Sequence, residues 1–366
     1  MTERGHVFGL DFLRAAAVAM VLITHASFLF LPLTRDLRVF DAWWMLGQLG
    51  VELFFVLSGF LIGGMLANQA ASGDLDIRQF WIRRWLRTLP NYYLFLLINF
   101  LIERWVSGAW PHATSYLFFW QNFAWPSPVF YGESWSLAIE EIFYLVAPLL
   151  VLFARTHAKS FLHPVALIVV GIAVFTLIRI VFVLYGNPTW DEGVRKVTLV
   201  RLDAIAYGVV AVLLYRRYRP DLKAAGVVAA LGIAGIAICA WAYLALPRDT
   251  SFFARTLLFN LISISFAALL PIGALWRNSG LPVFLDVAVR KLALWSYALY
   301  VSHLALLRVL VPVFGWKGTT PLECAVQAIA FSAMAIALAA LVHRVYEGPL
   351  MRLRDAIAPK TAPVTT

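Results

Sequence analysis

The sequence predicts an all-α polytopic membrane protein, a bundle of about ten transmembrane helices with both termini in the cytoplasm. Three observations predict this fold. Hydrophobic residues make up 62% of the chain and charged residues only 14%, far from the composition of a soluble domain. Apolar runs of about 20 residues, enough to cross about 30 Å of hydrocarbon as a helix, recur from end to end. Lys and Arg gather in alternate connections between these runs, as expected for repeated membrane crossings.

Ten apolar runs account for most of the chain. They lie at 10–31, 43–67, 88–106, 135–154, 163–185, 198–215, 224–246, 253–276, 292–314 and 321–343. The first run carries Arg14 and His25, and the second has small residues, Ser58 and Gly59, that allow close helix approach. The third run follows a basic block, and the fourth follows an aromatic-rich segment. Polar connections, most of them containing Pro or Gly, separate the later runs.

The distribution of charge orients the predicted bundle. With a cytoplasmic N-terminus, most of the 30 Lys and Arg residues lie on the cytoplasmic side, including those at 78–87, 216–223 and 344–360. This bias is the one that the positive-inside rule describes. The net charge of +10 therefore indicates orientation, and no nucleic-acid partner is expected.

One transmembrane domain is predicted at 1–354, followed by a disordered cytoplasmic tail at 355–366 that contains Pro359 and Pro363. Cys239 and Cys324 fall in separate spans and form no CxxC pair, so neither a disulfide framework nor a metal site is expected. The HExxH, GxSxG and P-loop motifs are absent from the sequence. Metal and nucleotide-hydrolysis mechanisms therefore have no support.

Two ionisable residues in the first run are the strongest functional signal. Arg14 and His25 have ten residues between them, and eleven helical steps of about 100° bring both side chains to one face, about 16 Å apart along the axis. Such groups are costly in lipid and usually face a bundle interior or an aqueous cavity. Two structural alternatives stay open. Arg14 could snorkel to the inner headgroups, and His25 could make a structural hydrogen bond to a neighbouring helix.

The stretch between Arg104 and Arg155 contains no Lys or Arg, which indicates an outer loop and the helix that follows it. Its aromatic residues, which end at Trp135, predict either an interfacial belt or a surface that stacks on sugar rings. Glu140 and Glu141 point about 100° apart on a helix, so at most one of them easily faces His25. Glu140 is expected at a depth similar to that of His25, where it would orient or charge-balance the imidazole.

Four further arginines lie in the outer third of their predicted spans: Arg179, Arg201, Arg255 and Arg308. They either snorkel outward singly or together line a positive vestibule for an anionic acceptor. Tyr300 and His303 lie in the ninth run. There His303 is either a packed, hydrogen-bonded side chain or part of the functional site.

Six ordered motifs resemble those of the acyltransferase-3 family of integral membrane acyltransferases. They are Leu10–His25 with its Arg-x10-His spacing, GVELFFVLSGFLI at 50–62, the basic block at 83–90, WSLAIEEIFYL at 135–145, Ser296–His303 and the closing Tyr346–Leu350. The resemblance covers most of the chain. One departure is Glu52, which stands where the family often has Asp.

The resemblance implies an O-acyltransferase in a cell membrane, the bacterial inner membrane, with acyl-coenzyme A, most simply acetyl-coenzyme A, as donor. A glycan or other hydroxylated acceptor would enter from the outer side. His25 would act as general base or carry a transient acyl group. The residues implied are Arg14, His25 and Glu140 for catalysis, Arg83, Arg84 and Arg87 for the donor, and Trp135, Arg201, Tyr300 and His303 for the acceptor. Membrane lipid surrounds the bundle, no metal is implied, and the oligomeric state is open.

Two other classes of function fit some of the same features. A transporter or flippase for a glycan or anionic substrate also uses intramembrane charges and a positive vestibule, but it needs no acyl-coenzyme A. A membrane scaffold would tolerate the loss of both Arg14 and His25.

Overall fold

The computed structural model describes residues 7–34, 36–73, 75–157 and 162–359, and within these ranges the chain is helical and contains no strand. The longer helices are α1 (Phe8–Ala26), α2 (Asp41–Ser72), α3 (Ile77–Ser107), α5 (Ser134–His157), α6 (Leu162–Gly186), α7 (Asp203–Tyr218), α8 (Leu222–Ala245), α10 (Leu257–Ala267), α12 (Val283–Val313), α13 (Pro321–Val342) and α14 (Gly348–Ile357). Short helices are α4 (Thr114–Leu117), α9 (Phe252–Arg255) and α11 (Leu270–Leu275). Short 3₁₀ or π segments lie at Ser27–Leu33, Leu37–Phe40, Asp191–Arg195, Thr198–Val200 and His343–Glu347.

Nine helical stretches in the described ranges are long and apolar enough to cross a membrane, which makes the chain an all-α polytopic membrane protein. These nine correspond to nine of the ten predicted runs. The remaining run, 88–106, lies within α3, a helix of 31 residues. Polar residues such as Asn91 and Asn99 lower the hydropathy of α3, and both are buried against the rest of the bundle.

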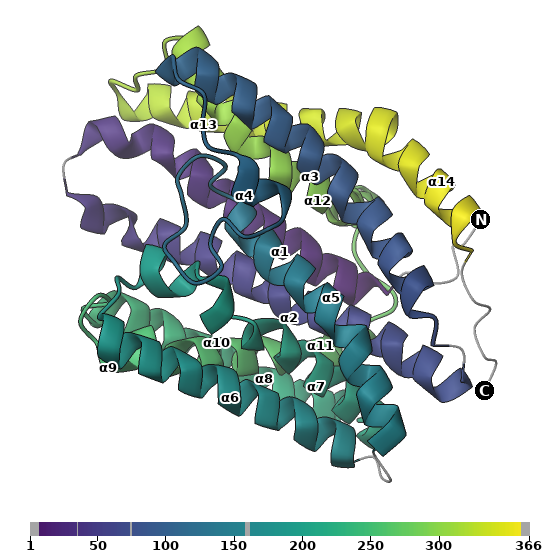
Figure 1. The fold of residues 1–366 in the computed structure, drawn as a ribbon. Helices are drawn as coiled ribbons and strands as arrows, with labels where there is room; N and C mark the ends of the chain where they lie inside the picture. The colour runs from purple at the N-terminus through teal and green to yellow at the C-terminus, as the bar shows by residue number, and fades with distance from the viewer. Residues whose placement is uncertain (1–6, 35, 74, 158–161, 360–366) are drawn as a thin grey trace.

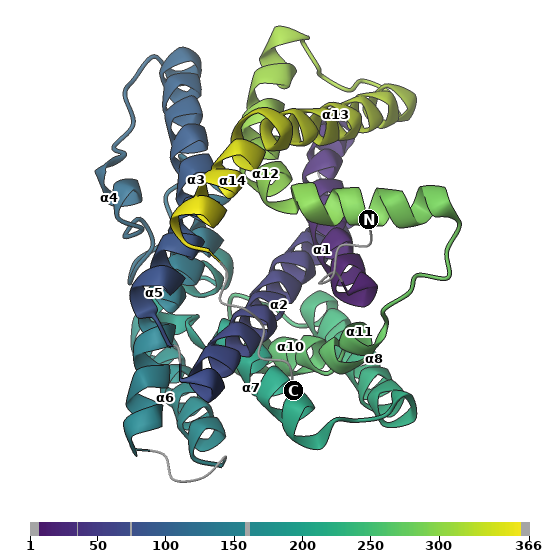
Figure 2. The same cartoon turned by 90° about the vertical axis from the view of Figure 1, so that its right-hand side faces the viewer.

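Helices α1 and α2 lie at the centre of the bundle (Figures 1 and 2). The α1 helix packs against α2, α11, α12 and α13, while α2 also contacts α5, α7 and α10. Figure 1 shows α3 and α12–α14 on one side of this pair and α6–α11 on the other. The two central helices therefore contact most of the elements that could build a site.

Glycines bring α2 and α7 into backbone contact. A Cβ atom at Gly59 would overlap the carbonyl oxygen of Ile205, and a Cβ atom at Gly208 would overlap that of Val56. Small residues commonly allow this close approach between membrane helices. The close approach expected at Gly59 is thus confirmed.

The first residues of the predicted disordered tail are ordered and contact α3. Residues 355–357 belong to α14, Asp355 pairs with Arg83 of α3 at 3.0 Å, and Pro359 O accepts from Gln79 Nε2 at 3.0 Å. Figure 2 shows α14 crossing α3. Disorder from 355 onward is therefore wrong for 355–359, while 360–366 lie outside the described residues.

Candidate functional site

A polar cavity of about 380 Å³ lies between five helices at the centre of the bundle. Its polar lining comprises Asp11 and Arg14 of α1, Ser58 of α2, Arg84, Arg87 and Thr88 of α3, Ser136, Glu140 and Tyr144 of α5, and Ser296, Tyr297 and Tyr300 of α12. Apolar side chains such as Phe54 and Leu57 complete the wall. The cavity therefore joins five of the six sequence motifs.

Three guanidinium groups line this cavity together with two carboxylates, those of Asp11 and Glu140. Arg84 Nε is buried without a hydrogen-bond partner, although its guanidinium carbon lies 4.1 Å from the centre of the Tyr144 ring. Among the described residues, Arg87 makes no ion pair or hydrogen bond. Arg14 has Asp11 at 3.8 Å. Because desolvated cations need partners, these guanidinium groups suit an anionic ligand, and the cavity brings Arg14 together with Arg84 and Arg87.

Glu140 belongs to the arginine cluster rather than to His25. Its Oε2 accepts a hydrogen bond from Tyr144 Oη at 2.5 Å, and that hydroxyl also lies 2.6 Å from Ser58 Oγ. Glu140 lines the same cavity as the three arginines. Among the described residues no hydrogen bond joins Glu140 to His25, because Glu140 bonds to Tyr144 while Nδ1 of His25 lies against Val21 O and His303 Nε2.

The partner of His25 is His303. Nδ1 of His25 lies 2.9 Å from Nε2 of His303 and 2.9 Å from the carbonyl oxygen of Val21. Nδ1 of His303 lies 3.0 Å from the carbonyl oxygen of Leu299. His303 is buried and His25 partly buried, so helices α1 and α12 meet through two imidazoles.

These contacts fix the tautomers of the neutral rings. A carbonyl oxygen can only accept, so Nδ1 must carry the proton in both rings. Nε2 of His303 is then an acceptor and shares the Nδ1 proton of His25 with Val21 O. The basic lone pair of His25 is consequently on Nε2, which is the arrangement that a general base requires.

Tyr300 connects the cavity with the histidine pair. Its ring lines the cavity, and the ring centre lies 6.0 Å from that of His303. Its hydroxyl lies 2.7 Å from Ser136 Oγ and donates to the carbonyl oxygen of Glu133 at 3.1 Å. Burial raises the pKa of the Glu133 carboxyl, just outside the α5 span, to about 8. The groups beside Tyr300 thus form a buried polar layer.

Two predicted ligand residues lie away from the cavity. Arg83 pairs with Asp355 and donates to the carbonyl oxygen of Ala358. Trp135 is only 4% exposed, and the guanidinium carbon of Arg195 lies 4.6 Å from its ring centre. Because its face is covered, Trp135 is not placed to stack on a sugar ring.

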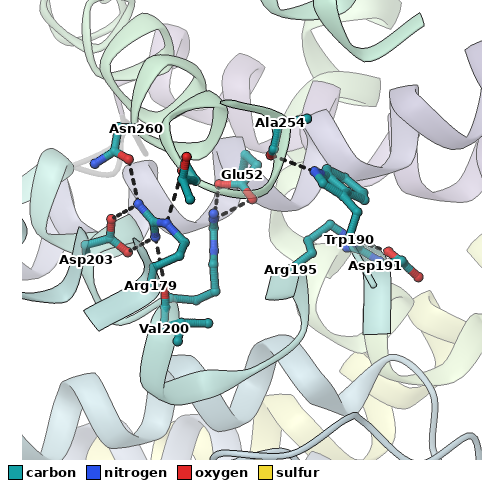
Figure 3. Close-up of polar contacts among 11 residues, drawn as sticks. Glu52, Arg179, Trp190, Asp191, Arg195, Val200, Asp203, Ala254 and Asn260 are labelled. Atoms are coloured by element: carbon teal, nitrogen blue, oxygen red, sulfur yellow. Dashed lines mark hydrogen bonds and ion pairs between the residues drawn. The ribbon is translucent and has the colours of Figure 1, made fainter. Parts of the chain in front are cut away.

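The outer arginines are bound inside the protein instead of lining an open vestibule (Figure 3). Arg201 is fully buried, and its Nη2 lies 2.6 and 2.7 Å from the two carboxylate oxygens of Glu52. Arg179 is also fully buried and makes two 3.0 Å bonds to Asp203. Arg255 is buried and donates to Asn187, while Arg308 pairs with Glu103. The positive vestibule is therefore wrong, and Arg201 is not exposed to an acceptor.

Sequence reasoning missed several cavity residues. Ser136 and Tyr144 flank Glu140 at intervals of four, so one face of α5 carries all three. Ser58 and Tyr297 lie within two of the six motifs, but no part in the functional site is predicted for either. The four-residue spacing in WSLAIEEIFY could have identified the α5 residues, whereas the contact of Tyr144 with Ser58 depends on tertiary packing.

The fold and site together define a multi-pass helical membrane protein with a cationic cavity that leads toward a histidine pair. A family model described as an acyltransferase domain, acyltransferase-3, matches residues 7–344. The chain belongs to this family.

Curated relatives share part of the chain. The peptidoglycan O-acetyltransferase OatA of Listeria monocytogenes is 32% identical over 180 residues, 43% of this chain and 26% of the relative. The putative peptidoglycan O-acetyltransferase YrhL of Bacillus subtilis is 33% identical over 177 residues, 42% and 25% of the two chains. A putative O-acetyltransferase of Staphylococcus aureus is 28% identical over 235 residues, 58% and 36%. The matches thus span 25–36% of these relatives' length. No solved structure matches significantly.

Proposed function

We propose that this protein is a membrane-bound O-acyltransferase that moves an acyl group, most simply acetyl, from acyl-coenzyme A to a hydroxyl of an extracytoplasmic glycan. One observation carries the proposal. A single cavity holds three guanidinium groups against two carboxylates and also reaches Tyr300, which lies beside the histidine pair. This arrangement suits a long anionic donor whose reactive end lies far from its phosphates.

Coenzyme A fits the charge of the cavity. Arg84, with its unpartnered buried Nε, and Arg87, without an ion pair, are the groups suited to phosphate oxygens. Arg14, nearer the centre of the bundle, would contact the donor between its phosphates and its acyl end. Both termini and the arginine end would lie in the cytoplasm, in agreement with the basic residues of that side.

The histidine pair supplies the proton chemistry. Nε2 of His25 accepts the proton of the acceptor hydroxyl as its oxygen attacks the thioester carbonyl. The C–O bond forms, the C–S bond breaks, and the imidazolium returns its proton to the thiolate of coenzyme A. His303 holds Nδ1–H of His25 through its Nε2 acceptor, so the productive tautomer is set before the donor binds. An acyl group carried transiently on Nε2 would use the same tautomer.

The class of acceptor comes from the relatives. Two of them are named for O-acetylation of peptidoglycan, one of these as putative, and a glycan hydroxyl is a suitable nucleophile for the chemistry above. The acceptor would approach the histidine pair from the end of the bundle opposite the arginines, in a bacterial inner membrane.

Mass spectrometry of surface glycans tests this function in cells with wild type, His25→Ala or no copy. His25→Ala should lower glycan acylation by about 10²- to 10⁴-fold, the usual contribution of a general base. His112→Ala is the matched control because His112 is exposed in the loop before α4. Membrane abundance is measured for every variant.

A transporter or flippase is the competing function. It would be supported if glycan export depended on the protein while purified protein neither bound coenzyme A nor released it from acetyl-coenzyme A. An unchanged glycan profile in the strain without the gene, together with no release of coenzyme A, would contradict the acyltransferase.

A further inference from the structure

A second cavity, of about 650 Å³, lies among α2, α5, α6 and α7. Its lining is almost entirely apolar, with Leu66, Phe143, Leu150, Ile168 and Phe175 among the larger side chains. The one ionisable lining residue in the described chain is Asp203, and Arg179 binds both of its carboxylate oxygens. An apolar cavity offers water no hydrogen bonds and is not expected to hold it.

The size and position of this cavity match one leaflet of a bilayer. Its lining runs from 142 to 153 on α5 and from 164 to 175 on α6, and eleven residues at 1.5 Å each extend about 16 Å. The hydrocarbon core is about 30 Å thick, so one leaflet is about 15 Å. All four enclosing helices belong to candidate membrane spans, so the cavity lies at hydrocarbon depth.

The cavity opens toward lipid and is separated from the polar cavity. Val146, Leu150, Phe153 and Leu167 line it and are also strongly exposed on α5 and α6. Ile62 is the one described residue that lines both cavities, and it packs in a cluster with Leu66, Phe80, Tyr144 and Ala147. This cluster lies between the two spaces, so a donor held by Arg84 does not extend into the apolar cavity.

We infer that this cavity binds one hydrocarbon chain of a membrane phospholipid, taken from the leaflet on the side of Arg84 and Arg87. The inference does not depend on acyl transfer. The bound chain fills the gap that α2, α5, α6 and α7 leave, and it contacts the far side of the α5 helix that carries Glu140. The chain acts as a structural ligand of the bundle.

Two glycines provide a matched test. A Cβ at Gly171 of α6 or at Gly226 of α8 meets nothing within 4 Å, and both residues are partly buried. Gly171 lines the cavity, whereas Gly226 does not. Gly171→Phe should therefore fill the space of the lipid chain, while Gly226→Phe adds the same ring elsewhere.

The experiment uses full-length protein in nanodiscs containing a phospholipid with a diazirine near the end of one acyl chain. Irradiation and peptide mass spectrometry should place the label mainly on lining residues such as Phe143 and Ile168. The outward-facing residues Val170 and Leu177 should carry much less. Gly171→Phe should lose the lining label and Gly226→Phe should retain it.

Equal labelling of lining and outward-facing residues in the wild type would overturn the inference, even if Gly171→Phe failed to accumulate. Retention of the lining label in folded Gly171→Phe would do the same. Competition by a long-chain acyl-coenzyme A but not by unlabelled phospholipid would assign the cavity to the donor and also overturn it.

Discussion

Nδ1 of His25 and Nε2 of His303 lie 2.9 Å apart across the contact of α1 with α12. The carbonyl oxygens of Val21 and Leu299 require a proton on Nδ1 of each neutral ring. His303 therefore acts as an acceptor toward His25 and leaves the lone pair of the His25 ring on Nε2. This relationship gives His303 a positioning role in the proposed reaction.

Substitution of His303 should lower the rate of acyl transfer without weakening the binding of coenzyme A. In His303→Ala, Nδ1–H of His25 keeps only Val21 O, and acyl transfer should fall by about 10- to 100-fold, as for other residues that orient a reactive group. His303→Gln can supply an acceptor oxygen and should retain part of the activity. The measurements are glycan acylation and the Kd for coenzyme A. Full activity of His303→Ala, or a weaker Kd with normal turnover, would contradict this role.

Substitutions of neighbouring arginines in α3 should differ in their effect on the affinity for coenzyme A. Arg84→Gln or Arg87→Gln removes a charged hydrogen-bond donor from the cavity, at a cost of about 1.5–3 kcal/mol, or about 10- to 100-fold in Kd. Arg83→Gln is the matched control because Arg83 pairs with Asp355 outside the cavity. Calorimetric titration with coenzyme A measures the Kd of each purified variant. Equal weakening by Arg83→Gln would argue against the cavity as the donor site.

The buried pair Glu52–Arg201 should matter for stability. Arg201→Met leaves the Glu52 carboxylate buried without its partner, which typically costs about 3–5 kcal/mol. Combining it with Glu52→Leu removes both charges and should recover most of the loss. Thermal unfolding in detergent, followed by tryptophan fluorescence, compares the stability of the wild type, Arg201→Met and the double variant. A double variant no more stable than Arg201→Met would mean that packing, not the unpaired charge, dominates.

The buried carboxyl of Glu133 should make the stability of the folded protein depend on pH. Burial raises the pKa of its carboxyl to about 8 in the folded protein, so between the ordinary pKa of Glu and pH 8 the folded state binds a proton that the unfolded state has lost. Stability from this group therefore falls as pH rises, by at most about 1.4 kcal/mol per unit, and levels off above the folded pKa. Glu133→Gln should raise Tm more at pH 8.5 than at pH 5. An equal rise in Tm at pH 5 and pH 8.5 would exclude a contribution of Glu133 to the pH dependence.

Much of the fold follows from the sequence alone. Runs of about 20 apolar residues determine membrane helices because an isolated backbone in lipid must satisfy its own hydrogen bonds, and nine of ten predicted runs meet the length and hydropathy expected of a span. The resemblance of the motifs singled out Arg14, Arg84, Arg87 and Glu140, and the structure brings these four residues to one cavity. The polar α3 is harder to assign because its asparagines face the protein and not lipid.

Tertiary structure alone decided which ionisable groups are paired. The sequence could not tell Arg83 from Arg87, or Arg201 from Arg14, because each is an arginine near a helix in lipid. Their partners, Asp355 and Glu52, are more than a hundred residues away along the chain. The sequence thus determined the class of fold and the cost of each intramembrane charge. Packing determined whether a guanidinium pairs directly with a carboxylate, as Arg201 does with Glu52, or faces a polar cavity, as Arg84 does, because only three-dimensional distance sets electrostatic partners.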